Sequence, residues 1–126
     1  MPPIVLVVDD SMVLRASVKY SLNAAGVDVA EATDGMDGLS VLSKLKKEGK
    51  RPAMIISDIN MPKMDGIAFI KEVKKTEAKF VPILILTTES QPHMKEEGKR
   101  AGAAGWLVKP FKEDQLVAVV RKFVKS

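Results

Sequence analysis

Five short apolar runs alternate along this chain with five longer segments whose apolar residues recur at helical spacing. The runs are rich in Val and Ile and cover residues 4–8, 27–30, 54–56, 82–86 and 105–108. Most are apolar at nearly every position, which is typical of strands buried on both faces of a parallel sheet. The run at 27–30 belongs to the alternating sequence VDVAEA and fits an edge strand.

The segments between these runs predict helices. Apolar residues recur every four positions from Leu14 to Leu22, and Gly26 is expected to end this first helix. Asp34 and Asp65 are expected to cap the second and third helices. The last helix carries a broad apolar face over residues 116–124.

The fourth helical segment, residues 92–103, is the weakest. It is polar nearly all round and is interrupted by Gly98, so it predicts a helix that is marginal unless something packs on it. The lysine-rich segment 44–51 is interpreted as the solvated end of the second helix.

Strict alternation of five strands with five helices predicts a five-stranded parallel sheet that is doubly wound, (βα)5, with helices on both faces. The length of 126 residues fits one domain over residues 1–126. In such a three-layer sandwich, functional groups gather at the carboxyl ends of the strands.

Composition excludes several classes of site. The chain has no cysteine, which excludes disulfides, thiolate metal sites and a cysteine nucleophile, and its single histidine cannot build a multi-histidine metal site. No apolar run approaches the roughly 20 residues that a membrane span needs. The start MPPIVLVVDD resembles no leader sequence, so we expect a cytoplasmic protein. A net charge of +4 is too small to indicate nucleic-acid binding.

Polar residues follow four of the predicted strands directly. They are Asp9, Asp10, Asp58, Thr87, Thr88 and Lys109. Taken singly, the acids could be helix caps, the threonines could reflect strand propensity, and the Lys-Pro sequence could be a turn. Together they place three carboxylates at one edge, where each like-charge pair would cost up to about 4 kcal/mol at ~4 Å.

Such a cluster requires a cation, and an all-oxygen site favours Mg²⁺ (or Mn²⁺) over zinc. A carboxylate beside Mg²⁺ can attack phosphorus and become an acyl phosphate. Asp58, on the central strand, is therefore the predicted nucleophile. Asp9 and Asp10 are expected to hold the metal with the main-chain carbonyl of Asn60. Lys109 is expected to contact a phosphoryl oxygen.

Four motifs carry a resemblance over nearly the whole chain. The sequences VVDDS, ISDINMPKMDG, ILTTES and GWLVKPF resemble the receiver domains of two-component response regulators, and in particular the single-domain chemotaxis regulators of the CheY type. The resemblance implies a flavodoxin-like, CheY-like fold with strand order 2-1-3-4-5.

The resemblance also implies roles for individual residues. Asp58 is the phosphoacceptor; Asp9, Asp10, Asp58 and the Asn60 carbonyl serve Mg²⁺; Thr87 and Lys109 bind the phosphoryl group. The Lys109–Pro110 peptide bond is expected to be cis. Thr87 and Trp106 form the switch, in which Trp106 stands where the family usually has Tyr or Phe.

Residues Asn60, Thr88 and Glu89 occupy positions that tune hydrolysis of the acyl phosphate in this family. Thr88 replaces the commoner Ala and is expected to narrow access to the phosphoryl group. By resemblance, we expect a phosphoryl state that lasts seconds to minutes.

The implied function is that of a stand-alone response regulator, a signalling protein rather than an enzyme. The implied partners are a CheA-like sensor histidine kinase, a flagellar motor switch protein or another protein target, and in some members a phosphatase. We expect a monomer without nucleic-acid binding or membrane insertion.

Alternative functions remain open. They are a phosphorelay intermediate or phosphate sink, a Mg²⁺-dependent aspartyl-phosphate phosphatase, a flavin-binding domain, and a receiver that has lost phosphorylation. The phosphatase is disfavoured because Asn60 stands where such enzymes carry a second acid, and the flavin domain because VVDDS places two negative charges after the first strand.

Overall fold

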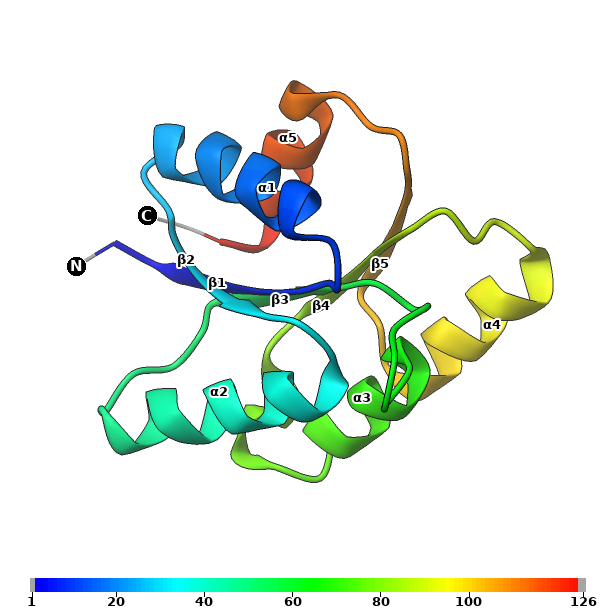
Figure 1. The fold of residues 1–126 in the computed structure, drawn as a ribbon, viewed down its shortest axis with the longest axis horizontal. Coiled ribbons are helices and arrows are strands. Elements are labelled where there is room, and N and C mark those ends of the chain that lie inside the picture. The colour runs from blue at the N-terminus through cyan, green and yellow to red at the C-terminus, as the bar shows by residue number, and fades with distance from the viewer. Residues whose placement is uncertain (1, 125–126) are drawn as a thin grey trace.

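The chain forms alternating strands and helices, which the computed structural model describes over residues 2–124. The strands are β1 (Ile4–Val8), β2 (Asp28–Ala32), β3 (Met54–Ser57), β4 (Ile83–Thr87) and β5 (Gly105–Val108). The helices are α1 (Met12–Ala24), α2 (Gly35–Lys47), α3 (Gly66–Val73), α4 (Pro92–Ala101) and α5 (Glu113–Phe123). The sheet forms the middle layer, with α1 and α5 on one face and α2, α3 and α4 on the other (Figure 1).

The sheet is parallel throughout, with strand order β2-β1-β3-β4-β5. This confirms the predicted doubly wound fold and the edge position of β2, although β2 begins and ends slightly later than the run at 27–30. Val8 pairs with Ser57 across β1 and β3. The residues that follow them, Asp9 and Asp58, therefore leave the sheet side by side.

The two faces of β1 explain why the strand is apolar at every position. Val5 and Val7 belong to the core between the sheet and helices α1 and α5, whereas Leu6 and Val8 belong to the core under α2 and α3. All four are at most 1% exposed. Since burying a Val or Leu side chain stabilises a fold by roughly 1.5–3 kcal/mol, both layers depend on this central strand.

Side-chain caps start three of the helices. Asp34 accepts a hydrogen bond from the Asp37 amide at 2.8 Å, and Asp65 accepts one from the Ala68 amide at 2.8 Å, so both predicted caps are confirmed. The cap of α1 is Ser11. The interpretation of Asp9 or Asp10 as the helix cap is therefore wrong, and both carboxylates are available for another role.

The polar helix α4 is formed, and Gly98 is its buried residue. A Cβ atom at Gly98 would lie 2.7 Å from Cδ1 of Ile85 and 3.0 Å from Cζ3 of Trp106. Glycine at this position lets α4 lie close against β4 and β5, so it has a packing role in a helix with few apolar residues. The helix ends at Gly102, whose φ is 113°.

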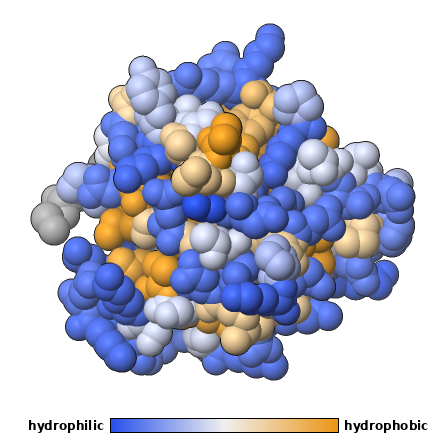
Figure 2. Space-filling view, viewed as in Figure 1, coloured by the Kyte–Doolittle hydropathy of each residue, from blue (hydrophilic) through white to orange (hydrophobic). Residues whose placement is uncertain are grey.

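A short 3₁₀ helix, η1 (Glu77–Phe80), follows α3 and is capped by Thr76. No periodic pattern in the sequence predicts it. The face shown in Figure 2 is mostly hydrophilic, with hydrophobic residues exposed in its upper part, where α1 lies. Among the described residues, no helix is both long enough and apolar enough to cross a membrane.

Gly66 generates a prediction because α3 starts against the end of β3. A Cβ atom at Gly66 would lie 2.1 Å from the carbonyl oxygen of Asp58, so Gly66→Ala must displace the backbone. We expect this variant to lose about 3 kcal/mol of the free energy of unfolding, measured by urea denaturation.

The matched control is Gly49→Ala, where φ is 72° and a Cβ atom would have no other atom within 4 Å. It should lose only about 1 kcal/mol through backbone strain. Equal losses in both variants would contradict the steric argument.

Candidate functional site

The carboxyl edge of the sheet brings three acids together. Asp9 and Asp10 follow β1, Asp58 follows β3, and these two strands are neighbours in the sheet. One carboxylate oxygen from each acid lies within 4.8 Å of the other two. Asp9 and Asp58 are buried, whereas Asp10 is exposed. The cluster therefore has two acids below the surface and one that faces solvent.

The carboxylate of Asp58 has two different environments at its two oxygens. Oδ1 accepts hydrogen bonds from the backbone amides of Ile59 at 2.7 Å and Asn60 at 3.4 Å. Oδ2 lies 3.2 Å from Nζ of Lys109. The loop after β3 thus holds Oδ1 in place, while Oδ2 faces the ammonium group of Lys109.

Asp9 is held in the same way. Its Oδ1 accepts a hydrogen bond from the Ser11 amide at 2.8 Å, and its Oδ2 accepts one from Lys109 Nζ at 2.9 Å. Burial raises the pKa of Asp9 above its ordinary value, and the negative charge of Asp58 raises it further, against the lowering effects of Ser11 and Lys109. Ionisation of Asp9 is therefore less favourable in the folded chain than in the unfolded chain.

Lys109 follows the edge strand β5, and its ammonium group bridges the two buried acids. Burial alone would lower the pKa of Lys109, but its hydrogen bond to Asp9 and the charges of Asp58 and Asp9 outweigh burial and raise it. The Lys109 amide also donates to the carbonyl oxygen of Thr87 at 2.8 Å. The Lys109–Pro110 peptide bond is cis.

The end of β4 connects this site to Trp106. Thr87 is fully buried, and its hydroxyl oxygen accepts a hydrogen bond from the Glu89 amide at 3.3 Å, whereas Thr88 is exposed. The indole N–H of Trp106 donates to the Glu89 carbonyl at 3.1 Å. Its ring is half-buried and occupies the space that Gly98 leaves open. The hydroxyl of Thr87 thus bonds to the loop after β4 rather than to the acids.

Two supporting residues were missed by the sequence reasoning. Arg15 donates a hydrogen bond to the carbonyl oxygen of Asp9 at 2.6 Å and forms an ion pair with Glu31 at 3.1 Å. The hydroxyl of Ser57 donates to the carbonyl oxygen of Asp58 at 2.8 Å. Ser57 could have been noticed as a polar residue after the apolar run at 54–56, whereas no sequence pattern connects Arg15 to Asp9.

The donor set of the cluster fits a divalent cation. Asp9, Asp10 and Asp58 offer only oxygen atoms, which suits Mg²⁺ or Mn²⁺. The cluster has three carboxylates, and the ammonium group of Lys109 pairs with two of them, Asp9 and Asp58. Two carboxylates 4.8 Å apart repel each other by roughly 3–4 kcal/mol at an effective dielectric of ~20, so added positive charge would stabilise the cluster. The exposed Asp10 leaves one side of the cluster open to solvent.

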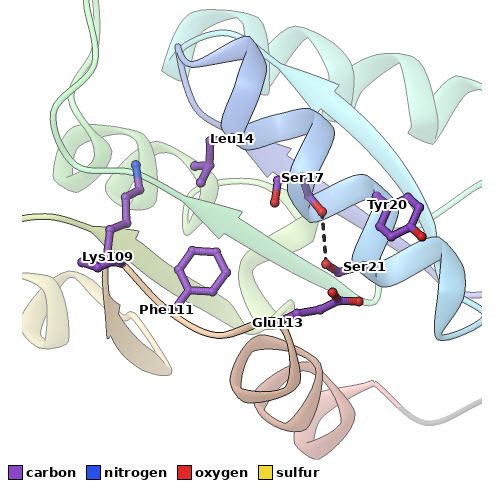
Figure 3. Close-up of a pocket in the computed structure, with 8 residues that line it drawn as sticks. Leu14, Ser17, Tyr20, Ser21, Lys109, Phe111 and Glu113 are labelled. Atoms are coloured by element: carbon purple, nitrogen blue, oxygen red, sulfur yellow. Dashed lines mark hydrogen bonds between the residues drawn. The ribbon is translucent and has the colours of Figure 1, made fainter.

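A cavity of about 480 Å³ lies next to the site, between α1 and the segment that follows β5. Figure 3 shows Lys109 at its edge, with the ammonium group turned away from Phe111 and Glu113. The three acids are not among its lining residues, which are Leu14, Ser17, Tyr20, Ser21, Lys109, Pro110, Phe111 and Glu113. The lysine therefore marks the boundary between the acidic cluster and this cavity.

Comparisons with known proteins agree on one family. The family model described as the response regulator receiver domain matches residues 5–121. A solved structure of the chemotaxis protein CheY4 from Vibrio cholerae is 44% identical, with a TM-score of 0.87. The match covers 98% of this chain and 100% of that chain.

Curated relatives are longer. The sensor histidine kinase CheAY of Helicobacter pylori is 36% identical over 123 residues, which are 97% of this chain and 15% of that protein. The transcriptional regulatory protein PrrA of Mycobacterium tuberculosis is 36% identical, over 98% of this chain and 50% of that protein. The chain thus spans half or less of the length of these two relatives.

The raised pKa of Asp9 predicts a pH-dependent stability. Because the folded chain binds a proton at Asp9 more tightly than the unfolded chain, this carboxyl stabilises the fold at low pH, and the contribution is lost as pH rises through the folded pKa. The free energy of unfolding of the wild type, minus that of Asp9→Asn, should therefore fall as pH rises from below the ordinary carboxyl pKa of 3.8 to above the raised pKa of folded Asp9. Urea unfolding with a chelator present measures it, and Asp28→Asn, at an exposed position on β2, is the reference. A difference that rises with pH would contradict this account.

Proposed function

The chain belongs to the response regulator receiver domain family, and we propose that it accepts a phosphoryl group on Asp58 from a phosphohistidine of a sensor kinase in a Mg²⁺-dependent reaction. The observation that carries this proposal is the ammonium group of Lys109 between the carboxylates of Asp9 and Asp58, beside the exposed Asp10. This arrangement has the nucleophile, the positive charge and the oxygen donors that phosphoryl transfer needs.

Asp58 supplies the attacking oxygen. Oδ2 is the reacting atom, because Oδ1 is held by the amides of Ile59 and Asn60. An Oδ2–P bond forms as the P–N bond of the phosphohistidine breaks, and the imidazole leaves with the electron pair and takes up a proton. The two amides orient the carboxylate, so its approach to phosphorus costs little reorganisation.

Asp9, Asp10, Asp58 and the carbonyl oxygen of Asn60 would hold Mg²⁺. When bound, the ion neutralises charge on the phosphoryl oxygens. Lys109 moves its ammonium from Oδ2 of Asp58 to a phosphoryl oxygen, which keeps the positive charge next to the new acyl phosphate.

Thr87 and Trp106 would form the switch. Phosphorylation adds about −1.5 to −2 charges and three acceptor oxygens. The Thr87 hydroxyl turns to one of these oxygens and gives up its bond with the Glu89 amide. Trp106 donates a hydrogen bond to the carbonyl of the same Glu89, so a shift of this loop moves the indole. Because the indole packs against Gly98, the position of α4 changes with it.

Asn60, Thr88 and Glu89 would set the lifetime of the acyl phosphate. Asn60 and Thr88 are exposed at the mouth of the site, and Glu89 is half-buried. In this position they control how water approaches the phosphoryl group, and we propose a lifetime of seconds to minutes.

Chemotaxis is the proposed pathway. The likeness to CheY4, a chemotaxis protein, supports a role as a stand-alone regulator whose target is a flagellar motor switch protein. The relative CheAY is a sensor histidine kinase, which supports a CheA-like phosphodonor. A phosphorelay intermediate or phosphate sink uses the same chemistry at Asp58 and differs only in the partner.

Phosphorylation can be tested by intact mass. Incubation with Mg²⁺ and a small phosphodonor should add one phosphoryl group, because the Ile59 and Asn60 amides orient Asp58 so that its Oδ2 faces Lys109. The addition should disappear in Asp58→Asn and with a chelator, and should persist in the control Asp28→Asn. A phosphoryl group that remains on Asp58→Asn would assign the nucleophile elsewhere.

Trp106 gives an optical test of the switch, since it is the single tryptophan of the chain. Saturation with Mg²⁺ and beryllium fluoride should change its emission, because the Glu89 loop to which it bonds moves with Thr87. Asp58→Asn should show no change, and Thr87→Ala should show a smaller one. Unchanged emission in a saturated wild-type sample would rule out this coupling.

A further inference from the structure

A second cavity lies at the opposite end of the sheet from the acids. It has a volume of about 630 Å³ and lies between the C-terminal half of α2, the segment before β3, the end of α3 and η1. Figure 1 shows α2 and the segment after α3 alongside each other below the sheet. Neither the acidic cluster nor the switch includes any residue that lines it.

The interior of this cavity is apolar. Leu39, Leu42 and Ala78 line it and are partly buried against the lower core, and Pro52 lines it as a buried residue. An apolar surface of this kind gains free energy when an aliphatic or aromatic side chain covers it.

The rim of the cavity is basic. Lys46, Lys50, Arg51 and Lys75 line it, against the two acids Glu72 and Glu77, so the lining carries an excess of positive charge. An anionic occupant complements the rim.

The cationic side chains on the rim extend into solvent and do not point together into the cavity. The side chains of Lys46 and Lys75 are 66% and 71% exposed and pair with Glu77 and Glu72. Arg51 forms no ion pair within residues 2–124. A small anion needs polar groups that converge inside the pocket. Exposed cations around an apolar centre instead match the charged rim and apolar core of a protein interface.

The position of the cavity separates it from the acidic cluster. Pro52 precedes β3 and Asp58 follows it. At about 3.3 Å per residue, the two positions lie roughly 20 Å apart along the strand. A partner on the cavity therefore leaves the acids accessible.

We infer that this cavity binds an acidic segment of a partner protein, with one or two apolar side chains in the cavity and carboxylates on the rim, whether or not Asp58 is phosphorylated. Such a contact holds the chain at a partner while the acidic cluster and the α4 side remain free to exchange phosphoryl groups and targets. The inference does not depend on the phosphorylation of Asp58.

The test uses the ¹⁵N-labelled full chain and three short synthetic peptides. The first combines Asp and Glu with Leu and Phe, the second replaces the acids by Lys, and the third replaces Leu and Phe by Ser. We expect only the first to shift the amide signals of Leu42, Ser43 and Ala78, with weaker binding as salt increases. Asp58→Asn, and the wild type with Mg²⁺ and beryllium fluoride, should bind it equally well.

Charge reversal then identifies the rim. Arg51→Glu combined with Lys75→Glu should weaken binding of the first peptide roughly tenfold. The matched control, Arg121→Glu combined with Lys122→Glu on α5, changes the charge equally at exposed positions away from the cavity. The amide spectra report that both variants are folded.

Several outcomes would overturn the inference. They are the absence of shifts at the cavity, equal shifts with the lysine peptide, equal weakening in both double variants, and binding that requires or excludes beryllium fluoride. Co-sedimentation with phosphatidylserine vesicles without peptide binding would replace the protein partner by a lipid surface. Peptide binding in a chain that takes no phosphoryl group would reject the proposed function alone.

Discussion

The ammonium group of Lys109 between the carboxylates of Asp9 and Asp58 is the interaction on which the site depends. Two buried acids at adjacent strand ends repel each other, and a cation delivered by β5 offsets this repulsion. The balance is incomplete, because Asp10 adds a third carboxylate and the pKa of Asp9 remains raised by burial. The same geometry therefore holds the acids together and favours a further cation.

This arrangement follows from the register of a parallel sheet. Adjacent strands end at one edge, so polar residues placed directly after apolar runs meet there without any long loop. Further contacts lie at the end of β4, next to this edge. The Thr87 hydroxyl and the Trp106 indole both hydrogen-bond to the backbone of Glu89. Gly98 lets α4 pack closely against the indole ring. A change of charge at Asp58 thus has a short series of contacts through which it can reach a helix surface.

Charge divides the molecule along the strands. The acidic cluster lies at the carboxyl ends, and the basic cavity between α2 and η1 lies towards the amino ends. The helices run back between the two ends, so residues at the end of α2 are far from Asp58 although both belong to the same layered fold. Under the two proposals, separate ends would let one surface respond to phosphorylation while the other holds a partner.

The sequence alone determined what depends on local pattern: the alternation of elements, the caps Asp34 and Asp65, and the meeting of acids and lysine at one edge. Apolar periodicity and capping act within a few residues, and the edge follows from a general rule for parallel sheets. Only the tertiary structure decided that Gly98 makes room for an indole, that Thr87 bonds to the Glu89 amide, and that Arg15 supports Asp9. The packing at Gly98 and the cavity beside η1 depend on side chains from separate elements, and no local sequence pattern encodes how far apart these elements lie. The hydrogen bonds of Thr87 and Arg15 depend on the backbone conformation of the loops after β4 and β1.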